Sequence, residues 1–67
     1  MQEIRISMAA ARVNARKTQQ DVADIMKVSK QTIVNWENGK VSPKPAQFKM
    51  FCDICDISED YVILPAV

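Results

Sequence analysis

Residues 18–38 read TQQDVADIMKVSKQTIVNWEN and contain the pattern from which the fold can be inferred. Thr18 and Ser29 each stand where the N-cap of a helix is expected, and Asp21 has the place of the acidic partner in a short capping box. Between the two predicted helices, Met26-Lys27-Val28 forms a brief turn. The pattern therefore predicts the helix-turn-helix arrangement.

The inner faces of these two helices follow from the helical spacing of their apolar side chains. The helix after Thr18 is expected to bury Val22, Ala23, Ile25 and Met26. The helix from Lys30 to about Asn38 is expected to bury Ile33 and Trp36. An aromatic ring can also stack on a nucleic-acid base, but the position of Trp36 three residues after Ile33 favours the core. Gly39 is expected just past the end of the helix from Lys30 to about Asn38, where a positive φ costs glycine little.

Helical spacing continues on both sides of this motif. It indicates a first helix through Ile4, Met8, Ala11 and Ala15, and a fourth from about Ala46 to Cys55 through Phe48, Phe51, Cys52 and Cys55. Residues 40–45 form a loop, because their two prolines cannot lie inside a helix. Ser58 is expected to cap a last short helix, with Tyr61, Val62 and Leu64 closing the core. We therefore expect an all-α fold of five short helices, in a single domain over residues 1–67.

The composition excludes most kinds of enzyme. A chain of 67 residues has room for one small core, and the absence of histidine removes the commonest general base and metal ligand. Two cysteines alone cannot complete a four-ligand zinc site. Cys52 and Cys55 lie at helical spacing on the buried face, which favours a structural role over a redox pair. We expect no enzyme, metal, cofactor or small-molecule ligand.

Membrane insertion and export are not indicated either. No apolar run approaches the ~20 residues that span a bilayer, and the first residues lack a signal-peptide pattern. The sequence therefore predicts a cytoplasmic location.

The net charge of +1 is unevenly distributed along the chain. Residues 1–45 carry eight Lys and Arg against four acids, a net charge of +4, whereas residues 46–67 carry one Lys against four acids, a net charge of −3. This division is typical of a protein with one surface that faces a polyanion and another that faces away. Ordinary variation of surface charge is the alternative.

The outer face of the helix from Lys30 to about Asn38 has the chemistry of a DNA reader. Gln and Asn can form two hydrogen bonds to adenine, Lys can donate to guanine, and the methyl groups of Thr or Val can contact thymine. These side chains are Lys30, Gln31, Thr32, Val34 and Asn35, and no acid joins them before Glu37. A helix can fit the major groove, roughly 12 Å wide. A merely solvated polar face is the alternative on this observation alone.

Several short motifs together resemble one known family. Residues 18–23 (TQQDVA), 28–33 (VSKQTI), 36–40 (WENGK) and 57–62 (ISEDYV) resemble the phage repressor and Cro type of helix-turn-helix, also called lambda-repressor-like DNA-binding domains. The resemblance covers roughly residues 4–63. It implies a DNA-binding domain whose third helix is the recognition helix.

The resemblance also implies roles for individual residues. The base-facing positions are Lys30, Gln31 and Asn35, to which we add Thr32 from its chemistry. The phosphate contacts are Gln19, which also supports the recognition helix, then Asn38, Lys40 and Lys44. Arg12 and Glu37 match a partly buried salt bridge that fixes the pose of the recognition helix.

The sequence departs from the family at positions where glycine is frequent. Arg16, Lys27 and Asp56 stand there instead, and a left-handed conformation costs a residue with a Cβ about 1–2 kcal/mol. These departures affect the expected stability rather than the expected fold.

The sequence thus predicts a sequence-specific regulator of transcription that binds double-stranded DNA, a repressor of phage, prophage or mobile-element type. An antitoxin of the same fold, which binds a toxin protein and its own operator, remains the alternative. The apolar tail of residues 61–67 suggests that the protein is a homodimer on a palindromic operator, with Ile63 and Leu64 in the interface. Packing of the tail against the first and fourth helices, or disorder of its last three residues, is the alternative.

Overall fold

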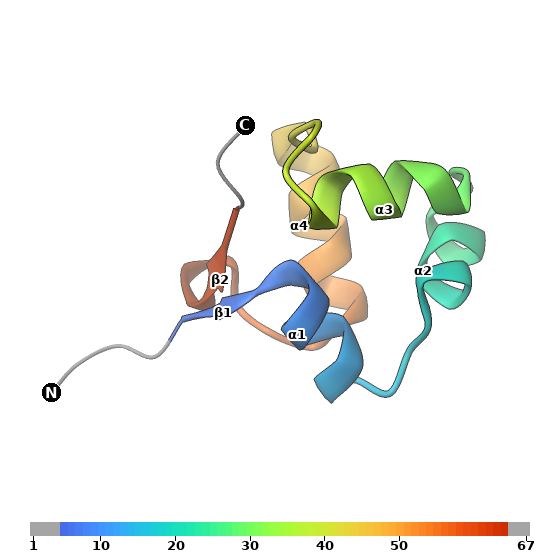
Figure 1. Ribbon diagram of the computed structural model, residues 1–67. Helices are drawn as coiled ribbons and strands as arrows, with labels where there is room; N and C mark the ends of the chain where they lie inside the picture. Colours follow the sequence, from blue (N-terminus) through green and yellow to red (C-terminus); the bar gives the residue numbers. More distant parts are fainter. Residues whose placement is uncertain (1–4, 65–67) are drawn as a thin grey trace, which may run out of the picture.

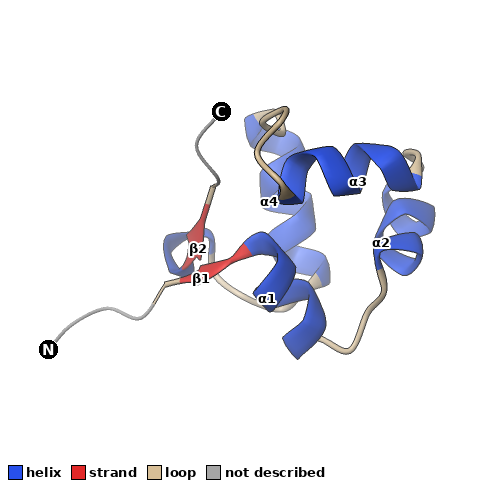
Figure 2. Cartoon of the chain, viewed as in Figure 1, coloured by secondary structure: helices blue, strands red, loops and turns tan. Residues whose placement is uncertain are grey.

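The computed structural model describes residues 5–64 and contains four α-helices, a single 3-10 turn and one pair of short strands in that range. The helices are α1 (Met8–Asn14), α2 (Gln19–Met26), α3 (Lys30–Glu37) and α4 (Pro45–Ile54), and the 3-10 turn is η1 (Glu59–Tyr61). The strands are β1 (Ile6–Ser7) and β2 (Val62–Ile63). Figure 1 shows α2 and α3 at one end of the molecule and the strands at the other. Figure 2 shows that helices make up most of the chain.

The predicted helix-turn-helix is confirmed, together with its caps. Thr18 Oγ1 accepts from the Asp21 N–H at 3.0 Å, and Asp21 Oδ2 accepts from the Thr18 N–H at 2.8 Å, so the capping box is complete. Ser29 Oγ accepts from the Thr32 N–H at 3.1 Å and caps α3. Lys27, between the helices, has φ 59°, which is the left-handed conformation that turns the chain.

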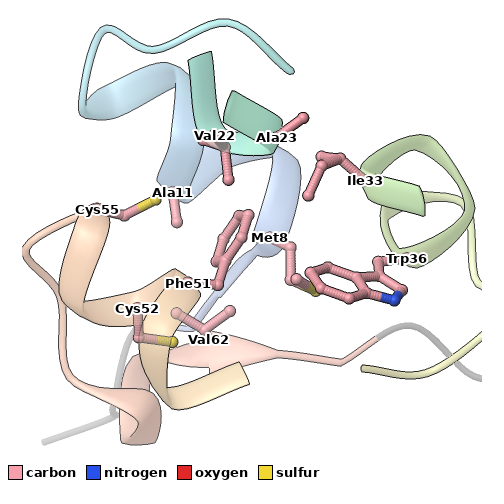
Figure 3. Close-up of a cluster of buried hydrophobic side chains, with 10 residues drawn as sticks. All are labelled: Met8, Ala11, Val22, Ala23, Ile33, Trp36, Phe51, Cys52, Cys55 and Val62. Atoms are coloured by element: carbon pink, nitrogen blue, oxygen red, sulfur yellow. The ribbon is translucent and has the colours of Figure 1, made fainter. Parts of the chain in front are cut away.

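The core lies where the helices meet, and most predicted members are present. Met8, Val22, Ala23, Ile33 and Phe51 are fully buried, and Trp36 is 3% exposed, so its predicted place in the core is confirmed. In Figure 3 the Phe51 ring lies in the middle of this cluster, and the Trp36 indole lies beside Met8.

Ile25 was expected in the core, and this prediction is wrong because its side chain is 47% exposed. Successive residues of a helix are about 100° apart, so Val22, Ala23 and Met26 share one face while Ile25 lies to its side. In a helix of 8 residues packed on one side only, that position reaches solvent.

The prediction of five helices is also wrong, because the last segment is only a 3-10 turn followed by a strand. Ser58 does cap this turn, accepting from the Asp60 N–H at 3.3 Å. The chain then becomes extended, and β2 pairs in parallel with β1, Ile6 opposite Val62 and Ser7 opposite Ile63.

The strand also changes which C-terminal side chains close the core. Val62 is 7% exposed, but Tyr61 is 46% and Leu64 40% exposed, so those two do not complete the core as expected. Adjacent strand residues point to opposite faces, and burying Val62 therefore turns Ile63 outward.

The first helix begins later than its apolar stripe suggested. Residues 6 and 7 belong to β1, and Ser7 caps α1 by accepting from the Ala10 N–H at 3.0 Å. Ile4, the first member of the predicted stripe, lies outside the described residues.

Candidate nucleic-acid interface

Helix α3 carries Lys30, Gln31 and Asn35 away from its buried face, and Thr32 lies at the edge of that face. Ile33 and Trp36 anchor its inner side in the core. Lys30 and Gln31 are exposed, while Thr32 and Asn35 are half-buried. The four predicted base-reading residues are therefore on one short helix whose orientation is fixed by packing.

Two of these four side chains are hydrogen-bonded to each other, and a third lies against the N-cap residue of α3. Gln31 Nε2 donates to Asn35 Oδ1 at 3.0 Å. The Thr32 hydroxyl lies 2.9 Å from the Ser29 hydroxyl, within hydrogen-bond distance, so its methyl group is the part with no role in the cap. Neither contact was predicted from the sequence, although residues three and four apart on a helix are neighbours and can form hydrogen bonds.

Arg12 and Glu37 form the ion pair that the resemblance implied. Arg12 Nε donates to Glu37 Oε2 at 2.7 Å, and Arg12 Nη2 donates to Glu37 Oε1 at 3.2 Å. The two side chains are only 13% and 7% exposed. Arg12 Nη1 also donates to the Lys17 carbonyl at 2.9 Å, which connects the ion pair to the loop between α1 and α2.

Gln19 joins the same network from the first residue of α2. Its Nε2 donates to Glu37 Oε1 at 3.0 Å, so the Glu37 carboxylate accepts from both α1 and α2. The network connects three helices, and it balances the acidic charge at the end of α3 with the Arg12 guanidinium. The positive charges of the neighbouring loop are therefore not opposed by Glu37.

The predicted phosphate contacts other than Gln19 lie in the segment after α3. Asn38 Oδ1 accepts from the Lys40 N–H at 3.1 Å, and Gly39 between them has φ 81°, which glycine adopts readily. Lys40 and Lys44 are exposed. Lys44 immediately precedes α4, where its N–H donates to Gln47 Oε1 at 2.9 Å, so its backbone is fixed while its side chain projects from the loop.

Neither cysteine has the environment of a reactive thiol. Burial raises the pKa of Cys52 to about 11 and also raises the pKa of Cys55. In Figure 3 the Cys55 sulfur points toward Ala11 and the Cys52 sulfur toward Val62. Within residues 5–64, no group of three or more His, Cys, Asp or Glu side chains could hold a metal ion.

Ile63 and Leu64, the predicted dimer residues, are 49% and 40% exposed. They follow η1, at the end of the molecule opposite α2 and α3. The structure therefore does not bring them together with the base-reading residues, which are on α3. In the part of the chain that the structure describes, no helix has both the length and the apolar character needed to cross a membrane.

A capped helix-turn-helix whose second helix is anchored in the core and polar outside is the architecture of a DNA-binding domain. The helix-turn-helix family model matches residues 8–62, and the chain therefore belongs to this family, of the Cro and lambda-repressor type. It is a family of DNA-binding transcription regulators, typically without enzymatic activity. No match was found among curated proteins or among solved structures.

Proposed function

We propose that this protein is a sequence-specific repressor of phage, prophage or mobile-element type that reads the major groove with α3. Lys30, Gln31, Thr32 and Asn35 would face the bases. Gln19, Asn38, Lys40 and Lys44 would contact phosphates on either side, and contacts of this kind fix the register of a protein on the duplex.

The observation that carries this proposal is the Glu37 network. Glu37 is the one acidic side chain of α3. It accepts hydrogen bonds from Arg12 and Gln19, and its side chain is only 7% exposed. The outer face of α3 is left with amides, a hydroxyl, a valine and one ammonium group, and the loop adds Lys40 and Lys44. Phosphates attract such a surface, and the remaining amides can still discriminate between bases.

We also propose that the protein binds a palindromic operator as a homodimer. One recognition helix contacts only a few base pairs, whereas two protomers can read half-sites about one helical turn apart. The exposed apolar side chains of Ile63 and Leu64 support a contact at the end of β2.

The experiment that tests the proposal is selection of bound duplexes from a random-sequence library, followed by measurement of Kd at several salt concentrations. We expect a defined palindromic motif and a log–log salt slope on the order of −2 to −4 per protomer. Recovery of no motif, or a Kd indifferent to salt, would contradict the proposal. An antitoxin that binds a toxin protein and its own operator would give the same motif and salt dependence. The test therefore addresses sequence-specific DNA binding, which both functions require.

A further inference from the structure

The hydrogen bond between Gln31 and Asn35 gives these two residues different tasks. The residues are one helical turn apart, and Gln31 Nε2 lies 3.0 Å from Asn35 Oδ1. Gln31 is exposed and Asn35 is half-buried, so Gln31 is the more accessible member of the pair. Asn35 is also closer to the C-terminal end of α3. Its backbone carbonyl accepts from the Lys40 N–H at 3.0 Å, which fixes this end to the following loop.

The hydrogen bond restricts how the Gln31 amide can face its surroundings. Asn35 Oδ1 can only accept, so the Gln31 carbonyl must turn away from it. A free glutamine side chain loses rotamer freedom when it is immobilised in a complex, and restraint before binding reduces that cost. Asn35 therefore prepares Gln31 for a contact that a freely rotating amide would make less well.

The groups that Gln31 keeps free match adenine. Its Nε2 has two N–H groups, of which the bond to Asn35 uses one. The other N–H can donate to adenine N7 while Oε1 accepts from adenine N6. Guanine presents acceptors at both N7 and O6, so Oε1 would meet another acceptor there.

We infer that Asn35 is a positioning residue that holds the Gln31 amide for reading the adenine of one A·T base pair. Asn35 then affects specificity through Gln31 and not through a base of its own, which narrows the base-facing role that the family resemblance implies and that the proposed function gives it. This inference rests on the proposed function, because it requires α3 to enter the major groove.

The test compares the wild type with Gln31→Ala, Asn35→Ala and the double variant, each selected against the same random-sequence duplex library. Kd is then measured for the selected duplex and its single-base-pair variants. Gln20→Ala is the matched control, because it removes a similar bond, from Gln20 Nε2 to Asp24 Oδ1 at 2.8 Å, from the exposed side of α2. Circular dichroism checks that each variant is folded.

We expect the wild type to prefer A·T at one position, and Gln31→Ala to reduce that preference by roughly 5- to 150-fold. Asn35→Ala is expected to reduce preference at the same position by roughly 2- to 10-fold, and to have no further effect in the Gln31→Ala background. Gln20→Ala is expected to leave the preference unchanged.

Three results would overturn the inference: a G·C preference at the Gln31 position, an Asn35→Ala effect at a different position, or an Asn35→Ala effect that persists without Gln31. If the wild type selects no motif at all, the proposed function itself fails. A motif with independent Gln31 and Asn35 effects refutes only the inference.

Discussion

Arg12 of α1 and Glu37 of α3 are 25 residues apart in the sequence and are joined by two hydrogen bonds, of 2.7 and 3.2 Å. Both side chains are largely buried, at 13% and 7% exposure. A buried ion pair is weak evidence for net stability, because removal of two charges from water opposes their attraction. Its clearer consequence here is geometric, since it ties the end of α3 to α1.

Removal of one partner is expected to be costly. Glu37→Ala strands the Arg12 guanidinium and is expected to lower the free energy of unfolding by about 3 kcal/mol, as measured by urea denaturation. Lys49→Ala is the matched control, because it breaks the Lys49–Asp53 pair at 3.6 Å, whose side chains are 65% and 68% exposed. The control is expected to change stability by less than about 1 kcal/mol. Equal effects of the two substitutions would contradict a structural role for the Arg12–Glu37 pair.

The capping box of α2 predicts a defined dependence of stability on pH. The Thr18 N–H donates to the Asp21 carboxylate, and this bond is the main reason why the pKa of Asp21 lies below its usual value. A lowered folded-state pKa stabilises the protein above the unfolded pKa, and that contribution is lost as the pH falls through the folded pKa. Asp21→Asn keeps an acceptor oxygen without a titrating group. Its unfolding free energy is therefore expected to fall less than that of the wild type between pH 5 and pH 2, and identical profiles would refute this assignment.

The turn between α2 and α3 offers a stabilising substitution. Lys27 has φ 59°, which glycine adopts without the Cβ penalty. Lys27→Gly is expected to raise the free energy of unfolding by about 0.5–1 kcal/mol, after the greater freedom of glycine in the unfolded chain is taken into account. Lys49→Gly, at an exposed position of α4, is expected to lower the free energy of unfolding by about 1 kcal/mol. Destabilisation by both substitutions would mean that the Lys27 conformation is not a source of strain.

The proposed dimer contact predicts a loss of cooperativity without a loss of folding. Replacing Ile63 and Leu64 together by Ser removes apolar side chains that are 49% and 40% exposed, so the melting temperature is expected to change little. Binding to a palindromic duplex is expected to become less cooperative, with half-site affinity nearly unchanged. Val62→Ser is the control, because Val62 is 7% exposed and its replacement is expected to cost about 1.5–3 kcal/mol of stability. Unaltered cooperativity in the double variant would place the dimer contact elsewhere.

The sequence predicted the helix-turn-helix more completely than the ends of the chain, and the reason is the range of the interactions involved. The caps at Thr18 and Ser29 depend on residues three positions away, so they can be read directly from the sequence. The pairing of β1 with β2 joins Ile6 to Val62 across nearly the whole chain. Strands of two residues are too short to show alternating hydrophobicity, and nothing local in the sequence distinguished them from helix ends.

The candidate site was also predicted only in part from the sequence. The polar outer face of α3 followed from helical spacing, whereas the partners of its side chains did not. Helical spacing makes Gln31 and Asn35 neighbours but does not show that they are hydrogen-bonded, and it cannot link Gln19 to Glu37, which lies on another helix. The Arg12–Glu37 pair was expected only from the family resemblance, since nothing in the local sequence links two residues on different helices.

The division of roles between α3 and the loop after it can be tested by measuring the Kd of Gln31→Ala and Lys40→Ala on the selected duplex and on a random duplex, over a range of salt concentrations. If α3 reads bases while the following loop holds phosphates, Gln31→Ala is expected to lose about 1–3 kcal/mol on the selected duplex and little on the random one. Lys40→Ala is expected to weaken binding to both duplexes alike and to reduce the salt slope by about one. Equal losses for Gln31→Ala on the two duplexes would contradict the assignment of α3 as the helix that reads DNA sequence.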